Sequence, residues 1–111
     1  MRITLCGSAK FESLFHQWNK DLTLAGHTVY GLAVYPSYMK GEKNWYSEEE
    51  KTKLDLVHLD KISNSDAIVV LNQDGYVGES TKKEIEWARI QNKKIYWHFQ
   101  NTSEPYAGNL L

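Results

Sequence analysis

One stretch of this chain, residues 65–88, constrains the fold most, because it predicts a strand, a tight turn and a helix in direct succession. Residues 67–71 form a short, continuous apolar run that is rich in β-branched side chains. Such a run is typical of a strand that is covered on both faces, as in a parallel sheet. Gly75 and Gly78 follow, and they permit backbone conformations that a side chain would obstruct. The stretch therefore predicts a buried strand whose carboxyl end opens into a glycine-containing turn.

The helix after this turn predicts a concave site for a ligand. Ser80 and Thr81 are preferred residues at helix N-termini, so we expect the helix to begin there. Open α/β sheets bind ligands at the carboxyl ends of their strands, and a helix N-terminus favours anions. Gly78, Ser80, Thr81 and the local amides could hold a phosphate or a sugar hydroxyl. Serine and threonine also cap helices without any ligand, and that reading stays open.

Glu84, in the first turn of this predicted helix, allows two interpretations. Thr81 and Glu84 have the spacing of a capping box, in which the glutamate accepts a hydrogen bond from the threonine amide. Alternatively, the carboxylate faces the crevice and attacks an electrophilic carbon. The spacing by itself favours the cap.

The rest of the chain predicts an alternation of strands and helices. We expect strands over residues 3–6, 28–34, 67–71 and 95–99, and helices over residues 11–25, 47–63 and 80–92. This order predicts an α/β fold: a single-domain, doubly wound parallel sheet of the Rossmann or flavodoxin-like type with about four strands. The carboxyl ends of the first and third strands then meet at the switch point of the sheet. Gly7, Ser8 and residues 74–81 should therefore line one crevice.

Composition excludes several classes of protein. A chain of 111 residues is expected to form one domain, and its net charge of −1 gives no basic field for a long nucleic acid. The single cysteine, Cys6, excludes a disulfide framework and a cysteine-based zinc cluster, and it favours a reducing cytoplasm. No apolar run approaches the length of about 18 residues that a membrane span needs. The N-terminus enters a strand directly and lacks the form of a signal peptide.

Two segments keep alternative interpretations. Residues 35–46 form a long loop that carries Tyr38, Trp45 and Tyr46, and such a loop is either a substrate loop or interface, or a flap packed on its own core. Residues 100–111 form a polar tail, which is either loosely ordered or docked on a partner through its last aromatic and apolar side chains.

Three polar residues are weaker candidates for chemistry. His58 lies on the second predicted helix between apolar neighbours, where a lone histidine is more often packed or exposed than catalytic. Asp74, at the end of the buried strand, either bonds a ribose hydroxyl or only shapes the turn with Gly75. Ser8 and the glycine before it often make a turn and nothing more.

Four segments together resemble the nucleoside 2-deoxyribosyltransferase-like superfamily, and more narrowly its short bacterial and phage branch. They are Gly-Ser at 7–8, Leu-Thr-Leu-Ala-Gly-His at 22–27, Ser-Asp-Ala-Ile-Val-Val at 65–70 and Gly-Tyr-Val-Gly-Glu-Ser-Thr-x-x-Glu-Ile-Glu-x-Ala at 75–88. The resemblance covers about residues 1–99, which we take as one domain, and leaves the tail at 100–111 unmatched.

The resemblance implies cleavage of N-glycosidic bonds. Enzymes of the superfamily act on nucleosides or nucleoside monophosphates, and they either transfer deoxyribose between bases or hydrolyse the bond. The family nucleophile is the glutamate of a Glu-Ile/Leu-x-x-Ala motif, which corresponds to Glu84. It attacks the anomeric carbon and forms a covalent glycosyl-enzyme, which a base or water then resolves. The resemblance therefore favours a catalytic Glu84 over a cap.

The resemblance also bears on the leaving base and on assembly. Well-studied members have an aspartate that helps to handle the base where this chain has His58. The short branch commonly has Leu-x-x-His-x-x-Lys-Ile in this region, so His58 is implied as the acid that protonates the base, with Asp60 as the nearby alternative. Family members often complete the site with residues of a neighbouring subunit, so a homodimer is implied.

These observations lead to three hypotheses. The first is an N-glycosidase or deoxyribosyltransferase for a deoxynucleoside or its 5′-monophosphate, needing no metal or redox cofactor. The expected sugar and phosphate ligands are Gly7, Ser8, Asp74, Gly75, Gly78, Ser80 and Thr81, and Tyr38, Trp45 or Tyr46 would stack on the base. The second is a non-catalytic nucleotide-binding protein, a sensor or sequestering protein of phage or bacterial origin. The third is a structural protein that binds a partner through its aromatic loop and tail.

Overall fold

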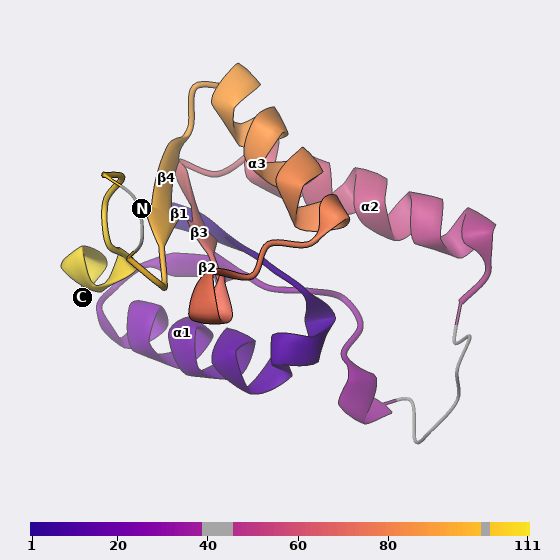
Figure 1. The fold of residues 1–111 in the computed structure, drawn as a ribbon, viewed down its shortest axis with the longest axis horizontal. Coiled ribbons are helices and arrows are strands. Elements are labelled where there is room, and N and C mark those ends of the chain that lie inside the picture. The colour runs from indigo at the N-terminus through magenta and orange to yellow at the C-terminus, as the bar shows by residue number, and fades with distance from the viewer. Residues whose placement is uncertain (39–45, 101–102) are drawn as a thin grey trace.

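A four-stranded parallel sheet forms the centre of the molecule (Figure 1). The computed structural model describes residues 1–38, 46–100 and 103–111. The strands are β1 (Arg2–Cys6), β2 (Thr28–Tyr30), β3 (Ala67–Val70) and β4 (Lys94–Trp97), and they lie in the order β2-β1-β3-β4. The helices between them are α1 (Glu12–Leu24), α2 (Glu48–Ser63) and α3 (Glu79–Ile90). The predicted doubly wound α/β fold is confirmed.

The sheet separates two layers of helices (Figure 1), α1 on one face and α2 with α3 on the other. Side chains alternate along each strand, so Leu5 belongs to the core under α1 while Cys6 belongs to the core under α2 and α3. The register pairs Cys6 with Val70, which brings the carboxyl ends of β1 and β3 together. This is the switch point at which doubly wound sheets bind ligands.

Two strands end earlier than their sequence patterns predict. β2 stops at Tyr30, because the Tyr35 hydroxyl occupies the space beside Gly31 and accepts a hydrogen bond from the Leu32 amide at 3.2 Å. β4 stops at Trp97. The Phe99 amide then donates to a side chain, the Asn72 Oδ1, at 2.8 Å. In both places a backbone amide bonds to a side chain and not to a neighbouring strand; the partner of Leu32 is three positions away and the partner of Phe99 is 27 positions away.

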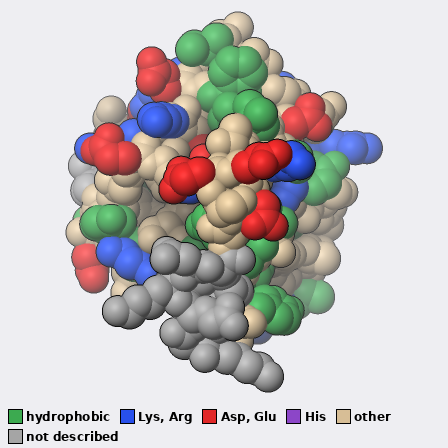
Figure 2. Space-filling model, turned by 90° about the vertical axis from the view of Figure 1, so that its right-hand side faces the viewer, with side chains coloured by type: hydrophobic (Ala, Val, Ile, Leu, Met, Phe, Trp, Pro, Cys, Tyr) green, Lys and Arg blue, Asp and Glu red, His purple; other side chains and the backbone are tan. Residues whose placement is uncertain are grey.

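Helix α2 begins where the sequence predicts. The Ser-x-x-Glu spacing of Ser47 and Glu50 predicts a capping box. The two residues form it, with the Glu50 amide 3.1 Å from Ser47 Oγ and the Ser47 amide 2.9 Å from Glu50 Oε1. Figure 2, which views the end of the molecule where α2 begins, shows acidic side chains gathered there, and the first turn of α2 is acidic. Negative charge stabilises the N-terminus of a helix, so this run is a solvated first turn.

The sequence predicts that Leu54, Val57 and Ile62 face inward from α2, and this is only partly correct. Ile62 is fully buried as predicted, but Val57 is 56% exposed. The buried neighbour is His58, which is 5% exposed. Val57 lies in the second half of α2 but on its exposed face, next to Leu56, which is 60% exposed. The first half of α2 extends past the sheet (Figure 1). Only the second half of the helix builds the core.

The described part of the tail, residues 103–111, packs on its own domain. Tyr106 forms an isolated parallel bridge with Trp97, and Ala107 is fully buried beside α1. The Glu104 carboxylate accepts hydrogen bonds from Arg89 and from the Trp97 indole, each at 2.6 Å. Within the residues described, no helix combines the length and apolarity needed to cross a membrane.

Candidate active site

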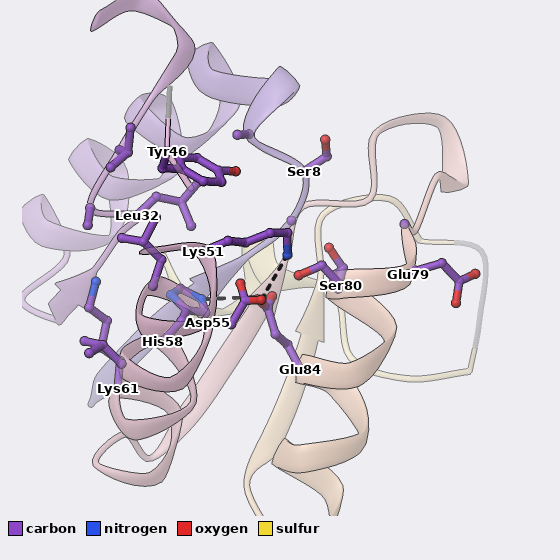
Figure 3. A pocket seen from close by; sticks show the side chains of 18 of the residues that line it. Ser8, Leu32, Tyr46, Lys51, Asp55, His58, Lys61, Glu79, Ser80 and Glu84 are labelled. Carbon is purple, nitrogen blue, oxygen red and sulfur yellow. Dashed lines mark hydrogen bonds and ion pairs between the residues drawn. The ribbon is translucent and has the colours of Figure 1, made fainter. Parts of the chain in front are cut away.

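A cavity of about 410 Å³ lies at the switch point, between the carboxyl end of the sheet and the helices α2 and α3 (Figure 3). Five segments line it: the turn after β1, the chain after β2, Tyr46 ahead of α2, the part of α2 from Lys51 to Lys61, and the turn before α3 with the first turns of that helix. Since these segments come from all parts of the sequence, only the fold brings them together. The volume lies within the range of about 300–1,000 Å³ that is typical of small-molecule sites.

Glu84 lies in this cavity and does not cap α3. The helix begins at Glu79, and its N-cap residue is Gly78, which makes no side-chain hydrogen bond to the helix. Thr81 is therefore already inside the helix. The capping-box interpretation of Thr81 and Glu84 is therefore wrong, and Glu84 belongs to the second turn. Figure 3 shows its carboxyl group pointing towards α2, into the cavity.

The environment of Glu84 is unusual for a carboxyl group. Its side chain is 12% exposed, and among the described residues Oε1 is the buried side-chain oxygen that lacks a hydrogen-bond partner. Burial raises the pKa of Glu84 to about 8, and the negative charge of Asp55 adds to this rise, while the Cys6 thiol and Lys51 oppose it. Glu84 is therefore mostly protonated at neutral pH in the free protein.

His58 faces Glu84 across the cavity as a neutral imidazole. Its Nε2 is 3.1 Å from the carbonyl oxygen of Leu5, and because a carbonyl only accepts, Nε2 carries the proton. Burial lowers the pKa of His58 to about 4, with Lys61 contributing. Nε2 is also 4.0 Å from Glu84 Oε1, a distance that would suit an ion pair. The opposite pKa shifts of the two groups make the contact one between neutral groups at pH 7.

Cys6, His58 and Glu84 are the described residues that come closest to a metal site. Their ligand atoms all lie within 4.8 Å of one another, and sulfur, nitrogen and carboxylate oxygen are donors that zinc accepts. Burial, with the nearby Glu84 carboxyl, raises the pKa of the Cys6 thiol well above its usual range. Binding a cation would require Cys6 and Glu84 to lose their protons and His58 to break its hydrogen bond to the Leu5 carbonyl. The cluster as it stands suits a reactive carboxyl group better than a cation.

The N-terminus of α3 forms the other end of the cavity. Gly78 and Ser80 line it there, and Gly7 and Ser8 face them from the turn after β1. The first amides of a helix have no partner inside the helix, so they are available to an anionic group. A side chain at position 7 would begin 3.0 Å from Leu71 Cβ, so glycine is required there for close packing. Thr81 also lines the cavity, although it is 3% exposed.

Several predicted site residues lie elsewhere. Tyr46 lines the cavity, whereas Tyr38 does not and is 75% exposed. Trp45 falls outside the described residues. Asp74 and Gly75 do not line the cavity either, and both have positive φ, 54° and 85°, as residues that shape the turn. Asp60 is exposed on α2, outside the cavity.

Three charged residues of α2 line the cavity although sequence reasoning had passed over them. Lys51 Nζ and Asp55 Oδ2 are 3.0 Å apart, and Lys61 Nζ donates to the Gly31 carbonyl at 2.9 Å. A signal existed in the sequence, because Lys51, Asp55 and His58 follow one another at helical spacings of four and three residues and so share one face of α2.

Comparisons with known proteins bear on the fold and on the family that this chain resembles. No protein-family profile matches the chain, and a search of curated proteins gives no match. Among solved structures, a CMP N-glycosidase of Clostridium botulinum is 26% identical over 87% of this chain and 70% of its own, with a TM-score of 0.51.

A second solved structure is a 2-deoxyribosyltransferase of Bacillus psychrosaccharolyticus. It is 22% identical over 92% of this chain and 76% of its own, with a TM-score of 0.58, and at that identity the likeness concerns the fold. Together with the sequence motifs, the two structures confirm the flavodoxin-like fold and the resemblance of this chain to the nucleoside 2-deoxyribosyltransferase-like superfamily.

Proposed function

We propose that this protein is an enzyme that cleaves the N-glycosidic bond of a deoxynucleoside or its 5′-monophosphate, with Glu84 as the nucleophile. The observation that carries the proposal is the buried Glu84 Oε1, which lacks a hydrogen-bond partner among the described residues and lies in a cavity of small-molecule size. Similarity to a CMP N-glycosidase and to a 2-deoxyribosyltransferase supports N-glycosidic cleavage or transfer in general.

In the first half-reaction, the Glu84 carboxylate attacks C1′ of the sugar. The electron pair of the N-glycosidic bond moves to the base nitrogen, and a glycosyl ester of Glu84 forms. In the second half-reaction, water or another base attacks C1′ and Glu84 leaves as a carboxylate. The positive charge that develops on the sugar favours an ionised Glu84, so the transition state stabilises the form that burial disfavours in the free protein.

The two ends of the cavity suit the two ends of a nucleotide. We assign the 5′-phosphate or 5′-hydroxyl to the N-terminus of α3, where Ser8, Gly78 and Ser80 surround free helix amides. The base would then lie towards Tyr46 and Leu32, which line the opposite side. A homodimer that works in the cytoplasm remains part of this proposal.

Measuring the free base that the protein releases tests the proposed cleavage directly. The protein is incubated with a panel of deoxynucleosides and their monophosphates, with and without a second base, and products are separated by chromatography. Glu84→Gln should lower base release by about 10⁴-fold or more, since the nucleophile is lost. Glu86→Gln, on the exposed side of the same helix, is the matched control and should retain activity. Unchanged base release by the Glu84→Gln variant would refute the assignment of Glu84 as the nucleophile.

A covalent intermediate gives a second readout. A 2′-fluorinated substrate destabilises the positively charged transition state, so the glycosyl-enzyme should form and accumulate. Mass spectrometry of proteolytic peptides should find the sugar on the peptide that contains Glu84. A label on any other residue would contradict the mechanism.

One observation favours a second candidate, a non-catalytic nucleotide-binding protein. The pKa of about 8 leaves Glu84 mostly neutral at pH 7, and a neutral carboxyl group binds polar ligands without attacking carbon. Calorimetry with the same panel separates the candidates. Tight binding without base release between pH 6 and pH 9, a range chosen to span roughly the titration of Glu84, would establish the binding protein.

A further inference from the structure

The leaving base needs a proton, and the two residues expected to supply it are poorly suited. The Nε2 proton of His58 is directed to the Leu5 carbonyl, and burial lowers the pKa of His58 to about 4, so the ring has no second proton at neutral pH. Asp60 is exposed and does not line the cavity. The acid must therefore be sought among the other residues that face Glu84.

Asp55 meets the geometric requirements. It lies three residues before His58 on the same face of α2, and it lines the cavity with a side chain that is 51% exposed, so it can reach a bound base. Its charge is among the causes that raise the pKa of Glu84, so the two carboxyl groups interact. Figure 3 shows Asp55 and Glu84 projecting into the same part of the cavity from two helices.

The surroundings of Asp55 differ from those of Glu84. Lys51 Nζ lies 3.0 Å from Asp55 Oδ2, so the free protein holds Asp55 as a carboxylate in an ion pair. Glu84 is buried and protonated. Lys61, the other cation that lines the cavity, donates to the Gly31 carbonyl. Two interacting carboxyl groups in unlike environments are a recurring arrangement for acid–base catalysis.

We propose that Asp55 is the acid–base residue of this site, and that Asp55 and Glu84 share one proton that passes between them during turnover. The inference rests on the proposed N-glycosidic cleavage and names a residue for which neither the sequence motifs nor the neighbours provided a role. Lys51 acts as a positioning residue that orients Asp55.

The proton balance closes over one cycle. In the free protein Glu84 is protonated and Asp55 is ionised. When substrate binds, the proton moves from Glu84 to Asp55, which leaves Glu84 as a nucleophile. Glu84 attacks C1′, the N-glycosidic bond breaks, and the base nitrogen takes the proton from Asp55. Asp55 then removes a proton from water, whose oxygen attacks C1′ and releases Glu84 as a carboxylate; the proton on Asp55 returns to Glu84.

Leaving-group dependence tests the acid step. Base release is measured for the substrate that the wild-type protein cleaves best, and for the same substrate with an electron-withdrawing fluoro or nitro group on the base. Asp55→Asn should lower the rate on the unsubstituted substrate by about 10²–10⁴-fold, and much less on the activated one, because an activated base leaves without a proton. Asp60→Asn, the exposed aspartate of the same helix, is the matched control and should behave as wild type.

Azide rescue tests the base step. Azide needs no deprotonation, so it should restore turnover of the activated substrate by Asp55→Ala and yield a glycosyl azide. Azide should leave Glu84→Gln inactive. Circular dichroism and thermal melting of each variant establish that it is folded, which is expected because the Asp55 side chain is half-exposed.

The outcomes separate this inference from the function on which it depends. If Asp55→Asn slows both substrates equally, or neither, the assignment of Asp55 is overturned while N-glycosidic cleavage stands. If Lys51→Gln shows the steep leaving-group dependence and Asp55→Asn does not, the acid is Lys51 and the inference is again overturned. If the wild-type protein releases no base from any substrate, the proposed function fails, and the role of Asp55 fails with it.

Discussion

The two faces of the sheet are built from the same strands but serve different purposes. On the α1 face, Phe15 and Leu22 are fully buried, and the tail closes the layer with Ala107, which is also fully buried. On the opposite face Ile62, Ile68 and their neighbours form a second buried core, and beyond the carboxyl ends of the strands α2 and α3 leave a cavity. One face is a closed hydrophobic core, and the other is open at one end.

The open face carries polar groups that the closed face does not need. His58 and Glu84 are both largely buried, and both are neutral at pH 7 because burial disfavours their charged forms. Burying such groups lowers stability, and their concentration at the ligand-binding edge of an α/β sheet indicates that function maintains them. Both faces therefore contribute a buried core to stability, whereas the candidate chemistry lies on the α2–α3 face alone.

The largest expected effect is a loss of stability when the hydrophobic core under α1 is disrupted. Phe15→Ala should lower the free energy of unfolding by about 3–5 kcal/mol, because it leaves a cavity in a fully packed core. Urea denaturation measures this value, and Leu24→Ala on the same helix, 80% exposed, should change it by less than about 0.5 kcal/mol. Base release per folded molecule should stay close to wild type. A selective loss of activity in Phe15→Ala would show that the two faces are coupled.

A pH series tests the open face. Because the pKa of Glu84 is raised above its unfolded value, the stability of the protein should fall as pH rises from about 4.5 through about 8. The pKa of His58 is lowered, so stability should also fall as pH decreases from about 6.5 through about 4. The two effects overlap and oppose each other from about pH 4.5 to about pH 6.5, so stability should be greatest there and should decline on either side.

Glu84→Gln separates the two limbs of that series. The variant should remove the alkaline decline, which amounts to a few kcal/mol at most, and keep the acid one. Urea denaturation at pH 6 and pH 9 (roughly the ends of the expected alkaline change) measures the difference. Glu86→Gln is the control and should follow the wild-type curve. An alkaline decline that persists in Glu84→Gln would mean that another group is its source.

The smallest effect concerns the part of α2 that no core supports. Ser47→Ala should destabilise the protein by about 1 kcal/mol, because it removes one half of the capping box. Since Lys51 and Asp55 follow directly in the first turns, the variant should also lower base release slightly more than the Ser47→Asp control, in which an acceptor is retained. Equal stability of Ser47→Ala and wild type would show that packing holds this end of α2.

Local patterns predicted most of the architecture. The apolar run at 67–71 became β3, the alternation of elements became the doubly wound sheet, and Ser47 with Glu50 became a capping box. Each of these depends on residues within about four positions of one another, or on one short run, so the sequence contains the whole cause. The crevice between the first and third strands follows from the order of elements by the same reasoning.

Long-range contacts decided the candidate site. Thr81 and Glu84 have the spacing of a cap, yet α3 begins at Glu79 and directs Glu84 into the cavity. His58 is neutral because burial lowers its pKa to about 4, and the hydrogen bond that it donates to the Leu5 carbonyl, 53 positions away in the chain, only partly opposes this shift. Burial and charge at one residue depend on partners that only the folded chain supplies. The sequence by itself determined the sheet and the position of its crevice, whereas the tertiary structure decided which carboxyl groups face it.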